Sequence, residues 1–162
     1  MYNAAIITLS DKGYEGKRKD ESKEVIEKIL IENNFTVSSY DLIPDDKEML
    51  KKILITLCDE KKVPLILTTG GTGFSKRDIT PDVTKEVIEK EALGIAEAMR
   101  VNSLKITKRA MLSRAAAGIR NTTLIVNLPG SPKAVYENLS YIIDELHHGL
   151  QVLLDDTQEC SR

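Results

Sequence analysis

The chain contains three short, mostly apolar runs: AAIITL at 4–9, PLILTT at 64–69 and TLIVNL at 123–128. Each run is continuous rather than alternating, which is typical of strands that are buried on both faces of a parallel sheet. A fourth run, TVSSYDLI at 36–43, alternates more between apolar and polar positions and ends at Pro44. We therefore expect the fourth run to form an edge or flanking strand.

Apolar residues recur at helical spacing in the stretches between these runs. The expected helices cover 21–34, 46–60, 80–92 and 94–106, with a long one from Ser131 to about Asp155. The helix at 80–92 is expected to have Thr80 as its N-cap and Pro81 in its first helical position. Strands that alternate with helices predict a single α/β domain, residues 1–162, with a mostly parallel sheet.

The loops that follow the four strands are all polar or glycine-rich. They read SDKGYEG, PDD, GGTGFSKRD and PGSPK in chain order. In open α/β sheets the ligand crevice lies at the carboxyl ends of the strands. If the sheet is parallel, these four loops meet at one edge, and we expect that edge to be the functional site.

Composition and charge narrow the classes of function. The chain has 162 residues and is 41% hydrophobic, which suits one domain with an aliphatic core. The net charge of −2 gives no electrostatic footprint for nucleic acid or a membrane, so any anion is expected to bind locally. Without a signal-peptide pattern or an apolar run near ~20 residues, the chain is expected to be cytoplasmic. We expect Cys58 to be buried and Cys160 to be an exposed free thiol.

The glycine-rich loop offers groups that bind phosphate. Glycines after a buried strand can turn with positive φ and present backbone N–H groups in a concavity. Hydroxyl and cationic side chains surround them: Thr69, Thr72, Ser75, Lys76 and Arg77. A tight strand-to-helix turn is the alternative interpretation. The pattern matches neither GxxxxGK[ST] nor GxGxxG, so it predicts a different anion-binding loop.

The second turn, LPGSPK, ends the last apolar run. Ser131 and Pro132 are suited to begin a helix, which alone explains them. Lys133, however, falls at the positive end of that helix, where a cation is disfavoured. This placement favours an anion above the helix.

Loop carboxylates suggest a divalent cation. Asp45 can cap the next helix, although Asp46 competes for that task, and Asp78 can pair with a neighbouring cation. Two loop aspartates beside phosphate-binding donors also suit Mg²⁺, which is often shared between carboxylates and substrate phosphates. Asp11 can cap, pair with Lys12 or bind a ligand.

Two further features are more ambiguous. The position of Asp82 in the first turn of its helix is explained by the helix dipole. The stretch SRAAAG at 113–118 is expected to be a helix or subunit contact, or else a ligand-binding segment. No Ser/His/Asp or Cys/His arrangement is visible, which argues against a hydrolase with a side-chain nucleophile.

Together the motifs resemble the molybdenum-cofactor biosynthesis family that includes MogA, MoaB and a domain of gephyrin. TTGGTGFSKRDITPD at 68–82 carries the resemblance most specifically, and TLSD, LIPDD, LSRAAAG and NLPGSPKAVYENL extend it over essentially the whole chain. The resemblance implies a three-layer α/β/α fold that binds molybdopterin, commonly as a homotrimer. It also implies transfer of AMP from MgATP to the terminal phosphate of molybdopterin, with release of pyrophosphate ahead of molybdate insertion.

The same resemblance implies roles for individual residues. Asp45 and Asp78 correspond to the family's two functional aspartates, here expected to be catalytic and to hold Mg²⁺. The implied substrate-binding residues are Asp11, Gly70, Gly71, Thr72, Gly73, Ser75, Ser113, Pro129, Gly130, Ser131 and Lys133. Lys12 stands where the family often has arginine, and it keeps the charge without the bidentate fork. A contact with the molybdate-inserting enzyme is also implied.

Three alternatives stay open at this point. The chain can be a molybdopterin carrier or scaffold without catalysis, or another nucleotide-processing enzyme similar to competence-damage proteins. It can also be a generic α/β domain whose loops are only turns. The TPD of RDITPD is closer to the MogA type, and retention of Asp45 and Asp78 favours the enzyme.

Overall fold

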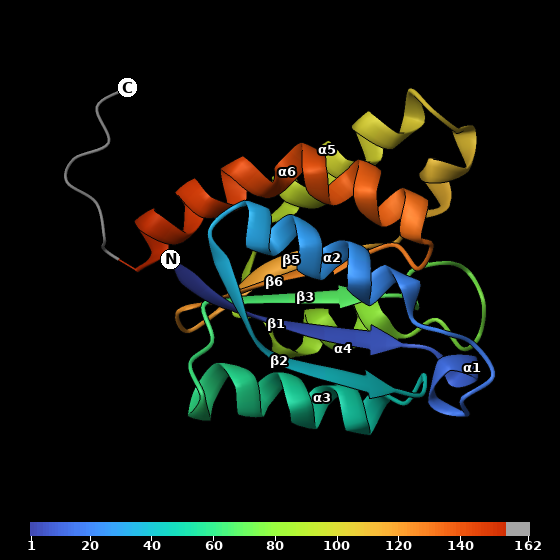
Figure 1. Cartoon of the computed structure of the whole chain (residues 1–162), viewed down its shortest axis with the longest axis horizontal. Helices are drawn as coiled ribbons and strands as arrows, with labels where there is room; N and C mark the ends of the chain where they lie inside the picture. Colours follow the sequence, from blue (N-terminus) through green and yellow to red (C-terminus); the bar gives the residue numbers. More distant parts are fainter. Residues whose placement is uncertain (155–162) are drawn as a thin grey trace.

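The computed structural model of the chain describes residues 1–154, which form a six-stranded sheet in the order β2-β1-β3-β6-β5-β4 (Figure 1). The strands are β1 (Tyr2–Leu9), β2 (Phe35–Ile43), β3 (Leu65–Thr69), β4 (Lys90–Glu91), β5 (Ala117–Arg120) and β6 (Thr123–Leu128). Strands β2, β1, β3 and β6 are parallel, whereas β5 and β4 continue the sheet in antiparallel fashion. The three continuous apolar runs are the central strands β1, β3 and β6, as predicted, and the alternating run is the edge strand β2.

Helices cover both faces of the sheet, which confirms the three-layer α/β/α architecture (Figure 1). They are α1 (Asp11–Tyr14), α2 (Glu21–Glu32), α3 (Lys47–Ile55), α4 (Thr80–Val87), α5 (Leu93–Leu104) and α6 (Pro132–Leu153), with a π-helical turn η1 (Thr56–Glu60) and a 3-10 turn η2 (Lys108–Leu112). Helices α2, α5 and α6 lie on one face, and α3 and α4 lie on the other.

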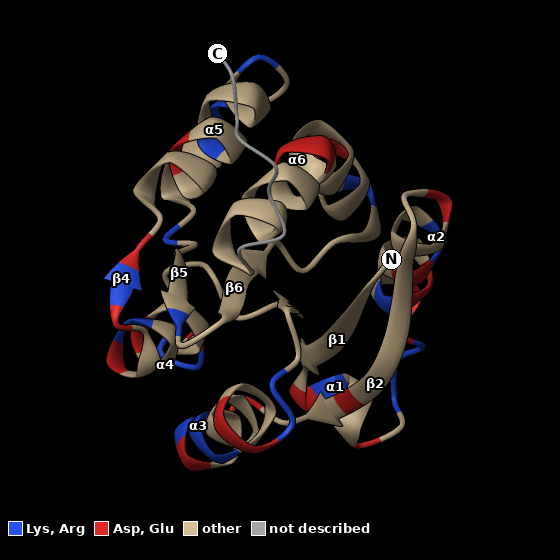
Figure 2. Cartoon of the chain, turned by 90° about the vertical axis from the view of Figure 1, so that its left-hand side faces the viewer, with Lys and Arg blue, Asp and Glu red and all other residues tan. Residues whose placement is uncertain are grey.

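The core is split by the sheet into two aliphatic clusters. Along β1, Ala4 and Ile6 belong to the cluster under α2 and α6, whereas Ala5 and Ile7 belong to the cluster under α3 and α4. Successive side chains of a strand point to opposite faces, so a strand covered on both sides must be apolar throughout. The positions of Lys, Arg, Asp and Glu accordingly fall mainly on the helices and loops, and β1 and β6 carry none (Figure 2). No helix among residues 1–154 is long and apolar enough to cross a membrane.

Of the expectations for Cys58, Cys160 and the end of the last helix, those within residues 1–154 can be compared with this fold. Cys58 is buried in the cluster under α3 and α4, as predicted. Cys160 and Asp155 lie outside the described residues, and α6 ends at Leu153. The long C-terminal helix is therefore confirmed up to that residue.

The segment from 80 to 120 differs from expectation. Helix α4 ends at Val87 instead of continuing to residue 92, because the chain turns to pair with β5: the Ala92 amide donates to the Ala117 carbonyl at 2.9 Å. Residues 117–120 form the strand β5, where the sequence pattern predicted neither a strand nor a helix. A Cβ on Gly118 would collide with the Ile88 side chain and with the Lys90 carbonyl oxygen, so glycine here permits the close approach of β4 to β5.

The start of α4 is also a correction. Thr80 is the first residue of the helix and not its N-cap, and Ile79 in the capping position makes no side-chain bond. The Thr80 hydroxyl instead donates to the Gly70 carbonyl at 2.9 Å. A buried carbonyl without a partner costs free energy, so this bond stabilises the loop GGTGFSKRD at 70–78, called the glycine loop below, rather than the helix.

A buried amide links the strands to α4. The Asn127 side chain donates to the hydroxyls of Thr68 and Thr84, at 3.0 and 2.9 Å, and accepts the Ala116 amide at 3.1 Å. Asn127 is fully buried on β6, Thr68 lies on β3 and Thr84 on α4. One side chain therefore fixes three elements beneath the loops.

Replacing Asn127 by Leu is expected to destabilise the fold by about 2–4 kcal/mol, because two hydroxyls and one amide lose their partner in the core. Thermal unfolding followed by circular dichroism measures this as a lowered Tm. Asn3, an exposed amide near the start of β1, provides the control position. An unchanged Tm for Asn127→Leu would show that the network contributes nothing.

Candidate functional site

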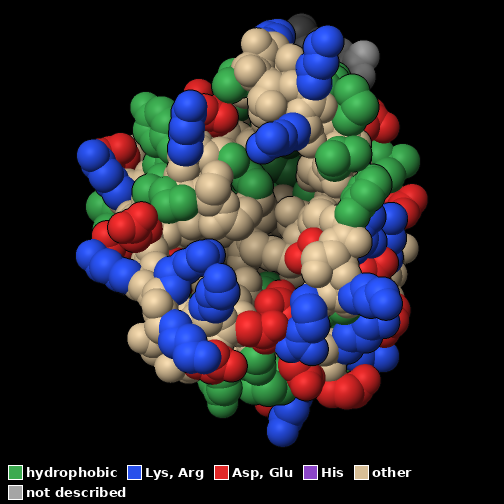
Figure 3. Space-filling model, turned by 90° about the vertical axis from the view of Figure 1, so that its right-hand side faces the viewer, with side chains coloured by type: hydrophobic (Ala, Val, Ile, Leu, Met, Phe, Trp, Pro, Cys, Tyr) green, Lys and Arg blue, Asp and Glu red, His purple; other side chains and the backbone are tan. Residues whose placement is uncertain are grey.

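A cleft of about 650 Å³ lies at the carboxyl ends of the four parallel strands. Figure 3 views this end of the molecule and shows a hollow bordered by acidic side chains, with Lys and Arg side chains on both sides. All four expected loops contribute to the cleft: Ser10, Asp11, Lys12 and Gly13 follow β1, Asp45 follows β2, Gly70, Gly71 and Asp78 follow β3, and Gly130 and Ser131 follow β6. The predicted convergence of the loops is therefore confirmed.

Gly70 and Gly71 turn the chain out of β3 with positive φ angles of 94° and 68°. A Cβ on Gly70 would collide with the Leu9 carbonyl oxygen, and a Cβ on Gly71 would lie 3.2 Å from Asp45 Oδ1. Only glycine adopts such a turn without strain and permits this approach. The two glycines thus bring the loop against the end of β1 and against the Asp45 carboxylate.

The adjacent residues Asp45 and Asp46 have separate tasks. Asp46 caps α3, since its Oδ1 accepts the Met49 amide at 2.9 Å. Asp45 is half-buried and lines the cleft. Burial, together with the negative charges of Asp11 and Asp78, raises the pKa of Asp45 above its ordinary value. Capping is thus done by Asp46, and Asp45 is left with its carboxylate at the cleft.

The Asp11 carboxylate ties three loops together. Its Oδ1 accepts the Asp45 amide at 3.0 Å, and its two oxygens accept the Arg77 guanidinium from Nη2 at 2.8 Å and Nε at 3.0 Å. Hydrogen bonds from Arg77 hold the pKa of Asp11 below its usual range. Of the roles considered for Asp11, the ion pair is present, but its partner is Arg77 and not Lys12.

The Asp78 carboxylate closes its own loop. Its Oδ2 accepts the Ser75 amide at 3.0 Å, and a Cβ on Gly73 would lie only 2.9 Å from the same oxygen. Gly73 therefore makes room for this carboxylate. Because Asp78 and Asp45 line the same cleft, the two expected catalytic residues share one cavity.

The turn from β6 into α6 lies beside the glycine loop. Thr69 Oγ1 donates to the Pro129 carbonyl at 2.6 Å, and Ser131 caps α6 by accepting the Ala134 amide at 3.2 Å. Lys133 is exposed in the first turn of α6 and lines neither this cleft nor the next one. The turn and the glycine loop thus form one continuous rim.

A second cleft, of about 290 Å³, is lined by four more of the expected residues. It is lined by Thr72, Gly73, Ser113 and Pro129 together with residues of α5, η2 and α6. The glycine loop therefore borders both clefts, with Gly70 and Gly71 in the first and its next two residues in the second. The expected substrate-binding residues are thus divided between these two spaces, except Ser75 and Lys133, which line neither.

Sequence reasoning missed the pair formed by Arg114 and Asp82. The two side chains form a bidentate ion pair with N–O distances of 3.0 to 3.2 Å, and Arg114 pulls the pKa of Asp82 below its usual range. The helix dipole alone had explained Asp82, but its charge faces a guanidinium instead. Nothing in the local pattern signals a pair separated by 32 residues.

The oxygen ligands of the first cleft fit Mg²⁺ in chemical type. No group of three or more His, Cys, Asp or Glu residues within 1–154 is arranged to hold a metal ion by itself. Mg²⁺ commonly takes one or two carboxylates and completes its shell with water and substrate phosphates. Asp45 and Asp78 supply two carboxylates, and burial together with the negative charges of Asp11 and Asp78 raises the pKa of Asp45, so a bound cation would stabilise its ionised form.

A crevice of glycine-rich loops at the carboxyl ends of a parallel sheet is typical of phosphate-binding sites in open α/β proteins. Comparison with known proteins identifies the group more closely. The model of a family described as a probable molybdopterin binding domain matches residues 5–148. The chain belongs to this molybdenum-cofactor biosynthesis family.

Individual relatives are similar over most of their length. The chain is 40% identical to the molybdopterin adenylyltransferase of Helicobacter pylori J99 over 92% of this chain and 86% of that protein. It is 38% identical to the molybdopterin adenylyltransferase of Escherichia coli K12, over 86% and 72% of the two chains. The solved structure of the molybdopterin biosynthesis enzyme MoaB from Thermus thermophilus superposes with a TM-score of 0.92 at 42% identity, covering 98% of this chain and 100% of that one.

Proposed function

We propose that this chain is a molybdopterin adenylyltransferase, which transfers AMP from MgATP to the terminal phosphate of molybdopterin and releases pyrophosphate. The observation that carries the proposal is that Asp45 and Asp78 line one cleft together with the glycine loop and the turn before α6. The names of the relatives from Helicobacter pylori and Escherichia coli support the same activity.

The site needs no side-chain base for this reaction. The nucleophile is a phosphate oxygen of molybdopterin, which is already ionised near neutral pH. Catalysis of such a transfer rests on positioning and on electrostatic stabilisation. The two clefts that meet at the glycine loop provide room for two substrates whose phosphates come together at that loop.

Each part of the rim has a proposed task. The Gly70 amide already donates to the Leu128 carbonyl at 3.3 Å, so the backbone amides of Gly71 and Thr72, together with the N-terminus of α6 at Ser131, bind phosphate oxygens. Lys133 adds positive charge at the helix start. The remaining expected substrate-binding residues line the two clefts: Gly73, Ser113 and Pro129 line the second, and Gly130 the first.

Two further residues support the catalytic carboxylates. Asp11 keeps Asp45 and Arg77 in place, and Ser75 orients Asp78 through its amide. Asp45 and Asp78 would hold Mg²⁺, which would offset charge on the phosphates when bound. The chain's own residues therefore set where the two phosphates meet.

The test is incubation of the purified protein with molybdopterin and MgATP, followed by mass detection of adenylyl-molybdopterin. The expected result is a product that requires the pterin, ATP and Mg²⁺ together and is lost in Asp78→Ala. Tight pterin binding without product would instead support the non-catalytic carrier or scaffold. Pyrophosphate release without pterin would favour another nucleotide-processing activity.

We also propose that the chain acts as a single cytoplasmic domain that assembles into a homotrimer and contacts the molybdate-inserting enzyme. Exposed apolar side chains on α5 and η2, including Val101, Leu104 and Met111, support self-association. Light scattering of the purified protein measures the mass, and a monomer at micromolar concentration would contradict the trimer.

A further inference from the structure

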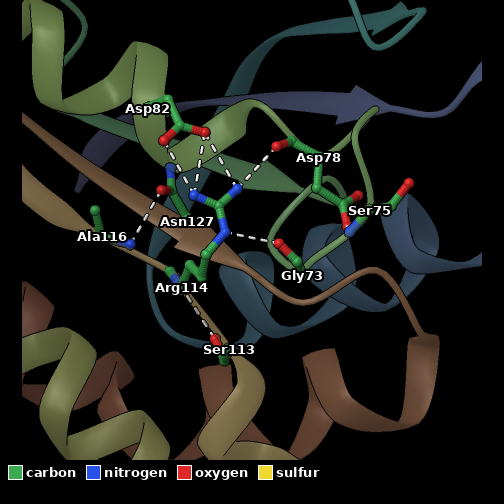
Figure 4. Close-up of polar contacts among 9 residues, drawn as sticks. Gly73, Ser75, Asp78, Asp82, Ser113, Arg114, Ala116 and Asn127 are labelled. Carbon is green, nitrogen blue, oxygen red and sulfur yellow. Dashed lines mark hydrogen bonds and ion pairs between the residues drawn. The ribbon is translucent and has the colours of Figure 1, made fainter.

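Arg114 joins both ends of the glycine loop to α4 (Figure 4). Its Nε donates to the Gly73 carbonyl at 2.7 Å, and its Nη2 donates to the Asp78 carbonyl at 2.8 Å. Its backbone amide donates to the Thr72 carbonyl at 2.9 Å. The same guanidinium forms the bidentate pair with Asp82 in the first turn of α4.

This geometry uses the particular shape of arginine. A guanidinium is a rigid planar fork whose donors reach a carboxylate and two carbonyls at once, whereas an ammonium is a point charge on a flexible stem. The Arg114 side chain is one-third exposed, so solvent competes only partly for these contacts. The loop is thus held at its two ends by one side chain.

The segment that carries Arg114 is itself held firmly. Two residues further on, the Ala116 amide donates to the buried Asn127 side chain, and the chain then enters β5 (Figure 4). A displacement of Arg114 relative to the sheet would require breaking that bond. Arg114 therefore fixes the position of the glycine loop relative to the sheet.

Asp78 is the residue that depends most on this clamp. Its carbonyl accepts from Arg114, while its carboxylate accepts the Ser75 amide within the same loop. Gly73, whose carbonyl Arg114 also engages, lies directly against that carboxylate. Fixing the Gly73 and Asp78 carbonyls therefore fixes the direction in which the Asp78 carboxylate points.

We propose that Arg114 is a positioning residue, which holds the glycine loop so that the Asp78 carboxylate stays in the cleft beside Asp45. It touches no reacting atom in this assignment and acts through Asp78. The effect on turnover rests on the proposed adenylyl transfer, whereas the effect on the loop does not. A lysine at this position would keep the positive charge but not the planar fork of donors, and it is therefore expected to be insufficient to hold the glycine loop.

The test compares Arg114→Lys with Arg120→Lys. Arg120 is a matched control, because it also forms a bidentate pair, with Asp59, and also donates to a backbone carbonyl, that of Val87. It lies at the far end of β5 from Ser113 and outside both clefts. Each substitution keeps the charge and removes a fork, so both are expected to lower Tm to a similar degree.

Two readouts then separate positioning from stability. In the free protein, hydrogen exchange of peptides covering 70–79 is expected to rise at least several-fold in Arg114→Lys and to stay unchanged in Arg120→Lys. In the adenylyl-transfer assay, Arg114→Lys is expected to lower kcat by about 10²-fold, with a smaller change in KM, since misplacement by about 1 Å costs this much.

Asp82→Asn provides a second variant that keeps the arginine. It leaves the two carbonyl contacts in place and weakens only the anchor on α4, so a smaller change of the same kind is expected. Unchanged exchange of 70–79 in Arg114→Lys would overturn the proposal, as would changed exchange with wild-type kcat. Absence of product from the wild-type protein would refute the proposed function and leave the exchange comparison to decide the role of Arg114 in the loop.

Discussion

Asp45→Asn is expected to lower adenylyl transfer by about 10²–10³-fold, the usual effect of removing one preorganised electrostatic group. Its folded stability is expected to be unchanged or raised. The pKa of Asp45 is raised by burial and by the negative charges of Asp11 and Asp78, so the folded protein disfavours the ionised carboxylate. A neutral amide of the same shape removes that cost. Steady-state product formation and the Tm of the same preparations measure the two effects.

The neighbouring residue provides the control. Asp46→Ala removes the cap of α3 and is expected to cost about 1 kcal/mol of stability while leaving turnover near wild type. Asp45→Asn is thus expected to lose activity but not stability, whereas Asp46→Ala is expected to lose stability but not activity. Normal turnover in Asp45→Asn, or a large loss of activity in Asp46→Ala, would refute the assignment of the catalytic carboxylate.

Asp45 and Asp46 also show how far local sequence can lead. Either aspartate can cap a helix that begins at residue 47, and the pattern alone does not choose between them. The choice is made by Asp11, which accepts the Asp45 amide from a loop 34 residues earlier. Contacts of this kind depend on the tertiary fold, so they were not available from local rules.

The central part of the sheet was predictable because its strands obey a simple physical requirement. A strand covered by helices on both faces has to be apolar at every position, and β1, β3 and β6 are buried along nearly their whole length. Strands β4 and β5 lack this signal. Residues 117–120 read AGIR, which is not a continuous apolar run, and their place in the sheet is set by close packing against Ile88 and by pairing with β6.

The candidate site was predictable in its residues and less so in its connections. Glycines, hydroxyls and aspartates at strand ends indicate a phosphate crevice because few other roles need these residue types together. The ion pairs Arg77–Asp11 and Arg114–Asp82 join residues separated by 66 and 32 positions. Sequence spacing carries no information on such pairs, although they determine that Arg77 and Arg114 are already paired with carboxylates of the chain itself.

Gly70→Ala is expected to destabilise the protein by about 2–5 kcal/mol and to abolish most adenylyl transfer. The residue has a φ of 94°, which L side chains rarely adopt, and the added methyl group would meet the Leu9 carbonyl oxygen. Backbone strain contributes about 1–3 kcal/mol and the collision a similar amount. The loop has to move away from β1, and the Gly70 carbonyl then loses the Thr80 hydroxyl. Thermal unfolding and the mass assay for product measure both consequences.

Gly149→Ala is the matched control for the same chemical change. Gly149 lies within α6, and a Cβ there would meet open space. Alanine in a helix is favoured over glycine by about 0.5–1 kcal/mol, so this variant is expected to be slightly more stable and fully active. A loss of stability in Gly70→Ala together with a gain in Gly149→Ala would show that the effect at Gly70 comes from its turn beside Leu9. Equal stability of the two variants would mean that the loop leaves β3 by another path, and the placement of the phosphate-binding amides would then be wrong.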